Sequence, residues 1–138
     1  MFINCHSHFS FKYGTMSVEA LIAEAKGKKL DALALTDINC TAGVFPFIRA
    51  AQKAGIHPVI GIDFRNGTDQ RYIGLARNQE GFFELNKHLS EHLTRKREFK
   101  SRAPKFENSF VIYPFSEKSF PLQENEFVGV HPSQLNKV

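Results

Sequence analysis

Short apolar runs that alternate with amphipathic helical stretches restrict the fold of this chain more than any other feature. Ala32 to Leu35 is a continuous apolar run, which predicts a strand buried on both faces, as in parallel sheets. It lies between two stretches with apolar residues at helical spacing, Val18 to Lys29 and Gly43 to Ala54. The alternation predicts an α/β fold with mostly parallel strands. With 138 residues, the chain has room for one domain or a small two-domain arrangement.

Turn and capping residues complete this outline. Thr15 or Ser17 can cap the first helix, and Gly55 is suited to end the second. Asn66 and Gly67 predict a tight turn that pairs Ile62 to Arg65 with Arg71 to Ala76 as a hairpin. The other predicted elements are strands over 2–5, 57–64, 110–113 and 127–130, a helix over 79–94 with Phe82, Leu85, Leu89 and Leu93 as its core stripe, and a final helix opened by Ser133.

The composition places the chain among ordinary globular proteins. It is 42% hydrophobic and 23% charged, and no apolar run approaches the roughly 18 residues of a membrane span. The start of the chain does not have the pattern of a secretory signal. Cys5 and Cys40 are therefore predicted to be reduced thiols of a cytoplasmic protein without membrane contact.

The net charge of +4 is concentrated in one segment. Between residues 95 and 105 there are six basic side chains and one acidic one, so the rest of the chain is close to neutral. Such a segment is either a solvated, mobile loop or a contact for nucleic acid or an acidic partner. The basic residues are Arg95, Lys96, Arg97, Lys100, Arg102 and Lys105.

Histidines and carboxylates follow three of the predicted strands. His6 and His8 come directly after the first strand, and Asp37 and Asp63 lie at the ends of two others. Ligands of α/β proteins gather at the carboxyl ends of strands, and this pattern suits zinc, manganese or iron and a metal-activated water that attacks a phosphoester. The alternatives are structural: Asp37 as a turn or helix cap, and Asp63 as a hydrogen-bond acceptor that closes the hairpin.

The remaining histidines have simpler interpretations. His88 and His92 have a metal-compatible spacing on the third helix, but no glutamate of the zincin motif stands between them. We expect both on a solvated flank of the helix. The sequence contains no Ser–His–Asp motif and no phosphate-binding glycine loop.

Three motifs in order resemble the PHP domain family (polymerase and histidinol phosphatase). They are His6-Ser7-His8, the strand end Ala34 to Asp37, and the segment Gly55 to Phe64. The stretch Tyr72 to Phe82 is similar, more narrowly, to the N-terminal PHP domain of bacterial DNA polymerase III alpha subunits. The resemblance is good over residues 1–94; 95–108 is the basic loop, and 109–138 match only loosely.

The resemblance implies a distorted (βα)7 barrel with a metal cluster at the strand ends. The whole chain, 1–138, then corresponds to a partial PHP domain, roughly the first half of that barrel, and we expect it to be a piece of a longer polypeptide. Exposed sheet edges and apolar surface predict self-association.

Carrying the family's ligand positions over predicts a degenerate metal site. His6 and His8 match, and Asp63 stands where the family has a bridging glutamate. At three further ligand positions of the family, this chain has residues that bind metals poorly or not at all. They are Tyr13, Ile38 and Arg71. Arg71 is expected to put a fixed cation in place of a metal. We therefore expect no bound cofactor, with zinc or manganese only if the site is active.

The resemblance leads to three functional hypotheses. The first is a structural and partner-docking segment of a replicative polymerase alpha subunit, itself without a polymerase active site. Its partners would be the rest of that subunit and the proofreading exonuclease subunit, with DNA contacted indirectly. The second is a metal-dependent PHP phosphoesterase using His6, His8 and Asp63. The third is a nucleic-acid contact through residues 95–105, whose binding should weaken steeply with salt.

Overall fold

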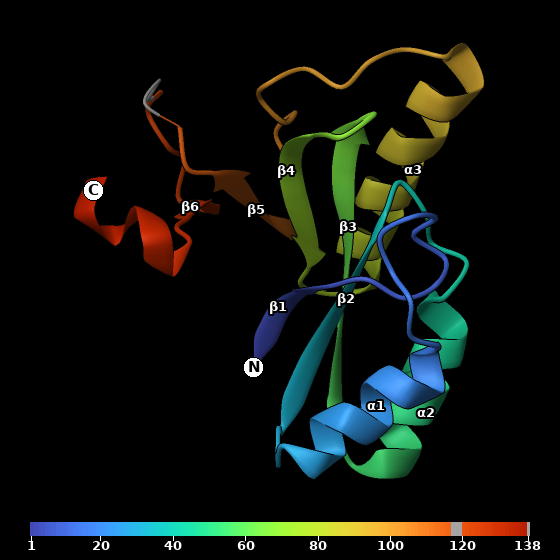
Figure 1. Cartoon of the computed structure of the whole chain (residues 1–138). Coiled ribbons are helices and arrows are strands. Elements are labelled where there is room, and N and C mark those ends of the chain that lie inside the picture. Colours follow the sequence, from blue (N-terminus) through green and yellow to red (C-terminus); the bar gives the residue numbers. More distant parts are fainter. Residues whose placement is uncertain (117–119, 138) are drawn as a thin grey trace.

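The computed structural model describes residues 1–116 and 120–137, which form one curved sheet with α-helices packed against it (Figure 1). Among the described residues, no helix combines the length and the apolar character needed to cross a membrane. In chain order the elements are β1 (Phe2–Cys5), α1 (Val18–Gly27), β2 (Ala32–Ile38), α2 (Val44–Ala54), β3 (His57–Asn66), β4 (Asp69–Ala76), α3 (Gln79–Arg95), β5 (Ser109–Pro114), β6 (Glu126–Gly129) and the 3-10 helix η1 (Pro132–Lys137).

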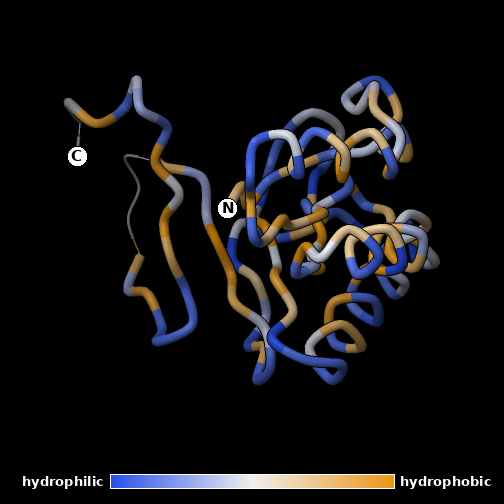
Figure 2. The backbone as a smooth tube through the Cα atoms, turned by 90° about the horizontal axis from the view of Figure 1, so that it is seen from below, coloured by the Kyte–Doolittle hydropathy of each residue, from blue (hydrophilic) through white to orange (hydrophobic). Residues whose placement is uncertain are grey.

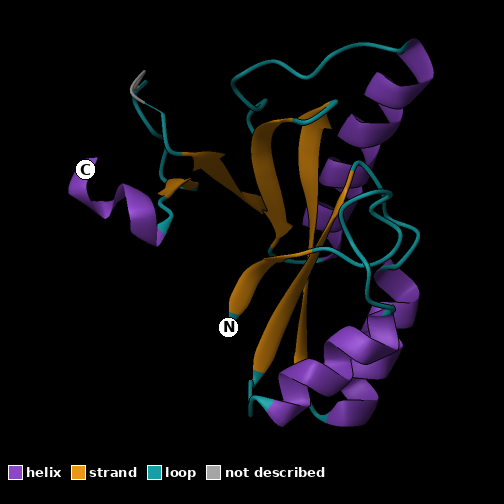
Figure 3. Ribbon diagram, viewed as in Figure 1, coloured by secondary structure: helices purple, strands orange, loops and turns teal. Residues whose placement is uncertain are grey.

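The strands lie in sequence order across the sheet, from β1 to β6. The pairs β1–β2, β2–β3 and β5–β6 are parallel, whereas β3–β4 and β4–β5 are antiparallel. Figure 3 shows α1, α2 and α3 on one side of the sheet, with the C-terminal segment away from α1 and α2. The predicted α/β fold, with most described pairings parallel, is confirmed.

Local capping chemistry sets the ends of the helices. The hydroxyl of Ser17 accepts a hydrogen bond from the Ala20 N–H at 3.1 Å, which identifies the cap of α1. Gly55 ends α2 in the left-handed conformation with φ of 73°, as expected of a glycine in this place. The side chain of Asn78 caps α3 by accepting from the Gly81 N–H at 2.9 Å. These caps fix where α1 and α3 begin and where α2 ends.

Two hydrophobic clusters fill the space between sheet and helices. The first joins β2 with α1 and α2, and the second joins β3, β4 and β5 with α3. Strand β3 contributes to both, because Ile60 packs against the first cluster while Ile62 and Phe64 belong to the second. A smaller cluster of Ala34, Ile73 and Leu75 lies on the other face of the sheet.

That other face is only partly covered. Figure 2 shows hydrophobic stretches of chain where the sheet meets the helices, and further ones in the C-terminal strands away from the helices. Phe110 pairs with Leu75 across β5 and β4, and Phe127 pairs with Ile112 across β6 and β5. Both phenylalanines are exposed.

The predicted core stripe of α3 is only partly correct. Leu85 and Leu89 are buried as expected, but Leu93 is exposed. The solvated flank expected for His88 and His92 is wrong. The His88 ring packs against Phe64, Phe99 and Phe106 at centroid distances of 5.3 to 5.6 Å, and the His92 ring stacks on Phe99 at 4.6 Å. Aromatic side chains from outside the helix therefore cover its histidine side.

The basic segment that follows α3 has no regular helix or strand over 97–108, but its side chains are not all solvated. Arg95 is the last residue of α3, and Phe99, Ala103 and Phe106 from the following segment are buried in the second cluster. The side chain of Asn66 bonds both the N–H and the carbonyl of Phe99 at 2.9 Å. The backbone of this segment is therefore anchored, while most of its cationic side chains face outward.

Several predicted boundaries shift by a few residues. Strand β2 continues to Ile38, so Asp37 lies within the strand, not after it. Asn66 pairs with Asp69, which leaves Gly67 and Thr68 as the hairpin turn. Strand β6 starts at Glu126, and the last helix is a 3-10 helix that begins at Pro132.

Candidate functional site

The carboxylate of Asp63 is the centre of the candidate site. Asp63 lies on β3 and is completely buried, whereas His6 follows the end of β1 and has 16% of its side chain exposed. The two meet because both strands run parallel to β2, so that their carboxyl ends lie at the same edge of the sheet. His6 Nε2 lies 3.0 Å from Asp63 Oδ2. The predicted convergence of these two residues is present.

Two neighbours of Asp63 were not expected from the sequence. The guanidinium of Arg65 donates from Nε and Nη2 to Asp63 Oδ2 at 3.1 and 2.8 Å. The amide of Gln70 donates to Oδ1 at 3.0 Å. Alternation along β3 places Arg65 on the same face as Asp63, and that two-residue spacing was the sequence signal that could have revealed the pair.

A shift in strand register explains why Arg71 does not occupy this place. Phe64 pairs with Tyr72 and Arg65 pairs with Gln70, which leaves Arg71 without a partner on β3. Arg71 instead forms an ion pair with Asp69 at 3.1 Å. The prediction that Arg71 supplies the fixed cation of the site is therefore corrected: the cation beside Asp63 is Arg65.

Electrostatics keep the Asp63 carboxylate ionised. Burial alone raises its pKa, but the hydrogen bonds from His6, Arg65 and Gln70 and the charge of Arg65 outweigh burial and hold the pKa below its ordinary value. Burial likewise lowers the pKa of Arg65, and the contact with Asp63 reverses that effect. Asp63 and Arg65 thus form a buried ion pair, and the Asp63 carboxylate is also hydrogen-bonded to His6 and Gln70.

Asp37 belongs to a separate network. Its Oδ1 accepts from the Ser7 N–H at 2.6 Å and from the Ser10 hydroxyl at 2.7 Å, and its Oδ2 accepts from the Ser7 hydroxyl at 2.7 Å. Ser10 in turn accepts from the Ile38 N–H at 2.9 Å. These contacts hold the loop after β1 against β2, which agrees with the structural alternative for Asp37.

The other predicted site positions divide into two groups. Tyr13 lies at the site, since the Arg65 guanidinium sits over its ring at 5.0 Å, and Ile38 pairs with Asp63 in the sheet. The His8 ring is exposed and lies beside Phe9 at a centroid distance of 4.5 Å. His8 therefore does not join His6 and Asp63 in the described structure.

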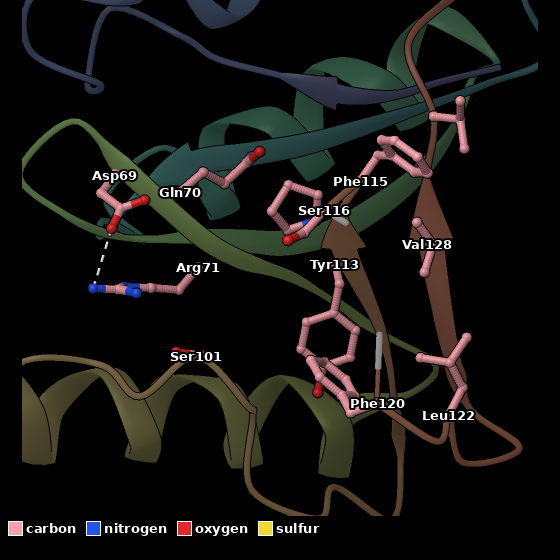
Figure 4. A pocket seen from close by; sticks show the side chains of 12 residues that line it. Asp69, Gln70, Arg71, Ser101, Tyr113, Phe115, Ser116, Phe120, Leu122 and Val128 are labelled. Carbon is pink, nitrogen blue, oxygen red and sulfur yellow. Dashed lines mark ion pairs between the residues drawn. The ribbon is translucent and has the colours of Figure 1, made fainter. Parts of the chain in front are cut away.

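A cavity lies elsewhere, between β4 and the C-terminal strands (Figure 4). Its volume is about 690 Å³, and Figure 4 shows Arg71, Tyr113, Phe120 and Val128 among its lining residues. A second, shallower pocket of about 540 Å³ borders the candidate site, with Arg65, Lys96 and Arg97 in its wall.

The predicted basic residues differ in their surroundings. Arg102 binds Glu126 at 3.1 Å and the Pro121 carbonyl at 3.0 Å, so it is engaged within the fold. Lys105 is exposed and has an ion pair with Glu107 at 3.2 Å. The remaining four, Arg95, Lys96, Arg97 and Lys100, are exposed.

A protein-family model described as the PHP domain matches residues 3–117, which is most of the chain. The chain belongs to the PHP domain family. The order of motifs that suggested this family, and the strand-end position of His6 and Asp63 in the structure, agree with the match. With it, the six-stranded curved sheet corresponds to roughly the first half of a PHP-type barrel.

Known relatives of this PHP segment are bacterial DNA polymerases. It is 39% identical over 85 residues to the error-prone DNA polymerase of Symbiobacterium thermophilum, a match that covers 62% of this chain and 8% of that protein. It is 35% identical over 96 residues to the DNA polymerase III subunit alpha of Ureaplasma parvum, covering 68% and 10%. The chain thus spans about a tenth of the length of these relatives. The predicted similarity to a polymerase III alpha PHP segment is confirmed.

The solved structures that match this chain include a Bifidobacterium adolescentis protein assigned as a metal-dependent phosphoesterase, with a TM-score of 0.48 and 21% sequence identity. The match covers 68% of this chain and 34% of that one. The family assignment of this chain rests on its sequence.

The donor set around Asp63 does not fit the metal that such a family implies. Because the ionised Asp63 carboxylate can only accept, His6 Nε2 donates the hydrogen bond between them, and that nitrogen has no free lone pair for a metal. Asp63 Oδ2 also accepts two hydrogen bonds from a cation. Within residues 1–116 and 120–137, no three His, Cys, Asp or Glu side chains are grouped closely enough to hold a metal ion.

Proposed function

We propose that this PHP segment works within a replicative DNA polymerase alpha subunit, as a structural and partner-docking module that performs no hydrolysis of its own. Family membership and the similarity to polymerase III alpha subunits support the setting. The observation that carries the functional part is the saturation of Asp63 by protein donors. A carboxylate occupied in this way cannot position a metal-activated water.

The partners follow from that setting. The first is the remainder of the alpha subunit, because the chain matches only about a tenth of its relatives. The second is the proofreading exonuclease subunit, and DNA is reached through the assembled polymerase. The proposal also places the protein in the cytoplasm, in keeping with its two free cysteines.

The catalytic alternative is tested by metal analysis and hydrolysis. Elemental analysis of the purified chain should find no stoichiometric zinc or manganese. Hydrolysis of p-nitrophenyl phosphate and of a thymidine phosphodiester should stay at the blank rate when either metal is added. Stoichiometric metal together with turnover that disappears in His6→Ala would establish the phosphoesterase and refute the proposal.

The docking part is tested by direct binding. The chain is immobilised and exposed to the proofreading exonuclease subunit and, separately, to an alpha subunit from which the matching segment has been deleted. Saturable binding of at least one of them at micromolar concentrations is expected. Binding of neither, with the chain folded by circular dichroism, would refute a docking role.

Contact with DNA is a second candidate function, favoured by one observation. Lys96 and Arg97 border the shallow pocket beside Arg65, so exposed positive charges meet there. The triple variant Arg95→Ala, Lys96→Ala, Arg97→Ala should weaken binding of single-stranded DNA and reduce the slope of log K against log salt by about 2. The triple variant Lys26→Ala, Lys28→Ala, Lys29→Ala removes the same charge from the end of α1 and serves as the control. Equal effects of the two triple variants would exclude a specific contact.

A further inference from the structure

The disagreement between the family's metal and the donors around Asp63 has a specific cause in this chain. Arg65 brings its guanidinium within 2.8 Å of Asp63 Oδ2, the same oxygen that accepts from His6 Nε2. Only 14% of the Arg65 side chain is exposed, and Asp63 is completely buried. A permanent positive charge therefore sits where a cation bound jointly by His6 and Asp63 would have to lie.

We propose that the guanidinium of Arg65 is the resident cation of this site and that it keeps divalent metals out. Its charge offsets that of the buried carboxylate, which is the electrostatic task of a bound metal. Unlike a metal, it is covalently attached and has no open position for water or substrate. The inference deepens the proposed function, on whose metal-free site it rests, because it names the residue responsible.

The surroundings hold the guanidinium in this place. It lies over the Tyr13 ring at a distance of 5.0 Å, which favours a cation on that side. The backbone of Arg65 is fixed as well, because its N–H and carbonyl bond the side-chain amide of Asn39 at 3.0 and 2.8 Å. With its backbone fixed, Arg65 can move its guanidinium aside to admit a metal only by losing the contacts with Asp63 and Tyr13.

Removal of the guanidinium should therefore allow His6 and Asp63 to bind a metal ion together. In Arg65→Met, Asp63 Oδ2 loses two hydrogen-bond donors. His6 Nε2 can then bind a metal through its lone pair when the ring proton is on the other nitrogen. Zinc is bound well by imidazole and carboxylate together. A ligand that binds only the folded protein raises its melting temperature. The variant should accordingly become sensitive to zinc, whereas we expect no such sensitivity of the wild-type chain.

The matched control is Arg77→Met. The Arg77 guanidinium also lies over an aromatic ring, that of Phe110 at 5.1 Å, but Arg77 is exposed. Both substitutions remove one arginine and one cation–aromatic contact, and they differ in the contact with a buried carboxylate. An effect specific to Arg65→Met thus reports on the pairing with Asp63.

The experiment compares melting temperatures in EDTA and in zinc chloride, with calorimetric titration of zinc chloride as a second readout. In EDTA, Arg65→Met should melt about 5–10 °C below wild type, and Arg77→Met within about 2 °C of it. Zinc should raise the melting temperature of Arg65→Met by several degrees and leave wild type and Arg77→Met unchanged. The added change Asp63→Asn should abolish the zinc response.

If Arg65→Met does not fold, Arg65→Gln takes its place in the test. The glutamine amide can still donate a hydrogen bond to Asp63, but it carries no charge. The inference is overturned if the folded Arg65 variant shows no zinc response, or if wild type shows the same response. Other results would refute the proposed function: metal-dependent turnover by the wild-type chain, or the absence of partner binding. A zinc response of wild type without turnover would overturn the inference alone.

Discussion

At the scale of single residues, Asp63 joins parts of the chain that are far apart in sequence. His6 reaches it from the loop after β1, and Gln70 reaches it from β4. Buried charges are tolerated when they are paired and hydrogen-bonded, and the Asp63 carboxylate meets both conditions. This carboxylate should therefore contribute to the stability of the fold as well as to the electrostatics of the site.

Asp63→Asn should lower the free energy of unfolding by about 3 kcal/mol, because it leaves the mostly buried Arg65 cation without its anion. Urea denaturation at pH 7 measures the change. Asp69→Asn is the control: its ion pair with Arg71 has 62% of the Asp69 side chain exposed, so the loss should stay below about 1 kcal/mol. Equal losses in the two variants would show that the buried ion pair of Asp63 contributes no more to stability than the exposed pair of Asp69.

The same pair predicts how stability responds to acid. The pKa of Asp63 is lower in the folded chain than in the unfolded one, so its contribution is complete above the ordinary aspartate pKa near 4 and disappears as the pH falls below that value. The difference in unfolding free energy between wild type and Asp63→Asn should therefore shrink between about pH 4 and pH 2. A constant difference over that range would exclude this linkage.

His88 should cause a separate loss of stability at mildly acidic pH. Burial, and secondarily the charge of His92, lower its pKa to about 4. Because the unfolded chain takes up this proton at about pH 6.5, stability should fall as the pH drops from about 6.5 to 4. Melting temperatures at pH 7.5 and 5 measure the effect, which should be smaller in His88→Phe; His57→Gln, at an exposed position, is the control.

The sequence predicted part of this site. Strand alternation and the order of strands were sufficient to bring His6 and Asp63 together. Arg65 was missed because family positions directed attention to Arg71, and the register shift after Phe64 that separates Arg71 from Asp63 depends on strand pairing. His88 was misjudged because its covering residues, Phe99 and Phe106, come from a segment without periodic pattern.

At the scale of elements, the start of α3 is held against the end of the basic segment. Glu84 accepts hydrogen bonds from the N–H groups of Glu107 and Asn108 at 3.2 and 3.1 Å. The Ser109 hydroxyl donates to the Gly81 carbonyl at 3.2 Å. The first turns of α3 therefore fix where the chain enters β5.

Gly81 tests this close approach. A Cβ at Gly81 would lie 2.0 Å from the Asn108 carbonyl oxygen, so Gly81→Ala should destabilise the fold by about 1–3 kcal/mol. Gly27 in α1 has open space around it, and Gly27→Ala should instead stabilise by about 0.5–1 kcal/mol. Chemical denaturation compares the two variants. Stabilisation by both would show that α3 can shift away from β5 without loss.

The helices and strands themselves were largely predictable. Their apolar periodicities and caps are local signals, and they placed α1, α2, α3 and the β3–β4 hairpin to within a few residues. The anchoring of the basic segment was not predictable in this way. It depends on two phenylalanines seven residues apart and on Asn66 of another strand, contacts that arise only after the sheet has formed.

At the scale of the whole molecule, the uncovered face of the sheet should cause self-association. Phe110 and Phe127 contact each other at a centroid distance of 5.9 Å, and both remain exposed. We expect light scattering to give an average mass that rises with protein concentration. Phe127→Ser should reduce the rise, whereas Phe83→Ser, at a still more exposed position on α3, should not. A concentration-independent monomer mass for the wild-type chain would refute this expectation.

The sharing of β3 between two hydrophobic clusters has a consequence for the order in which the fold opens. One cluster holds α1 and α2, the other holds α3 and the basic segment, and β3 is the strand that contributes to both. Amide hydrogens of α1 and α2 should then exchange with solvent deuterium as one block and those of α3 as another. The central amides of β3, around Ile60 and Ile62, should exchange last, because they are released only when both blocks have opened.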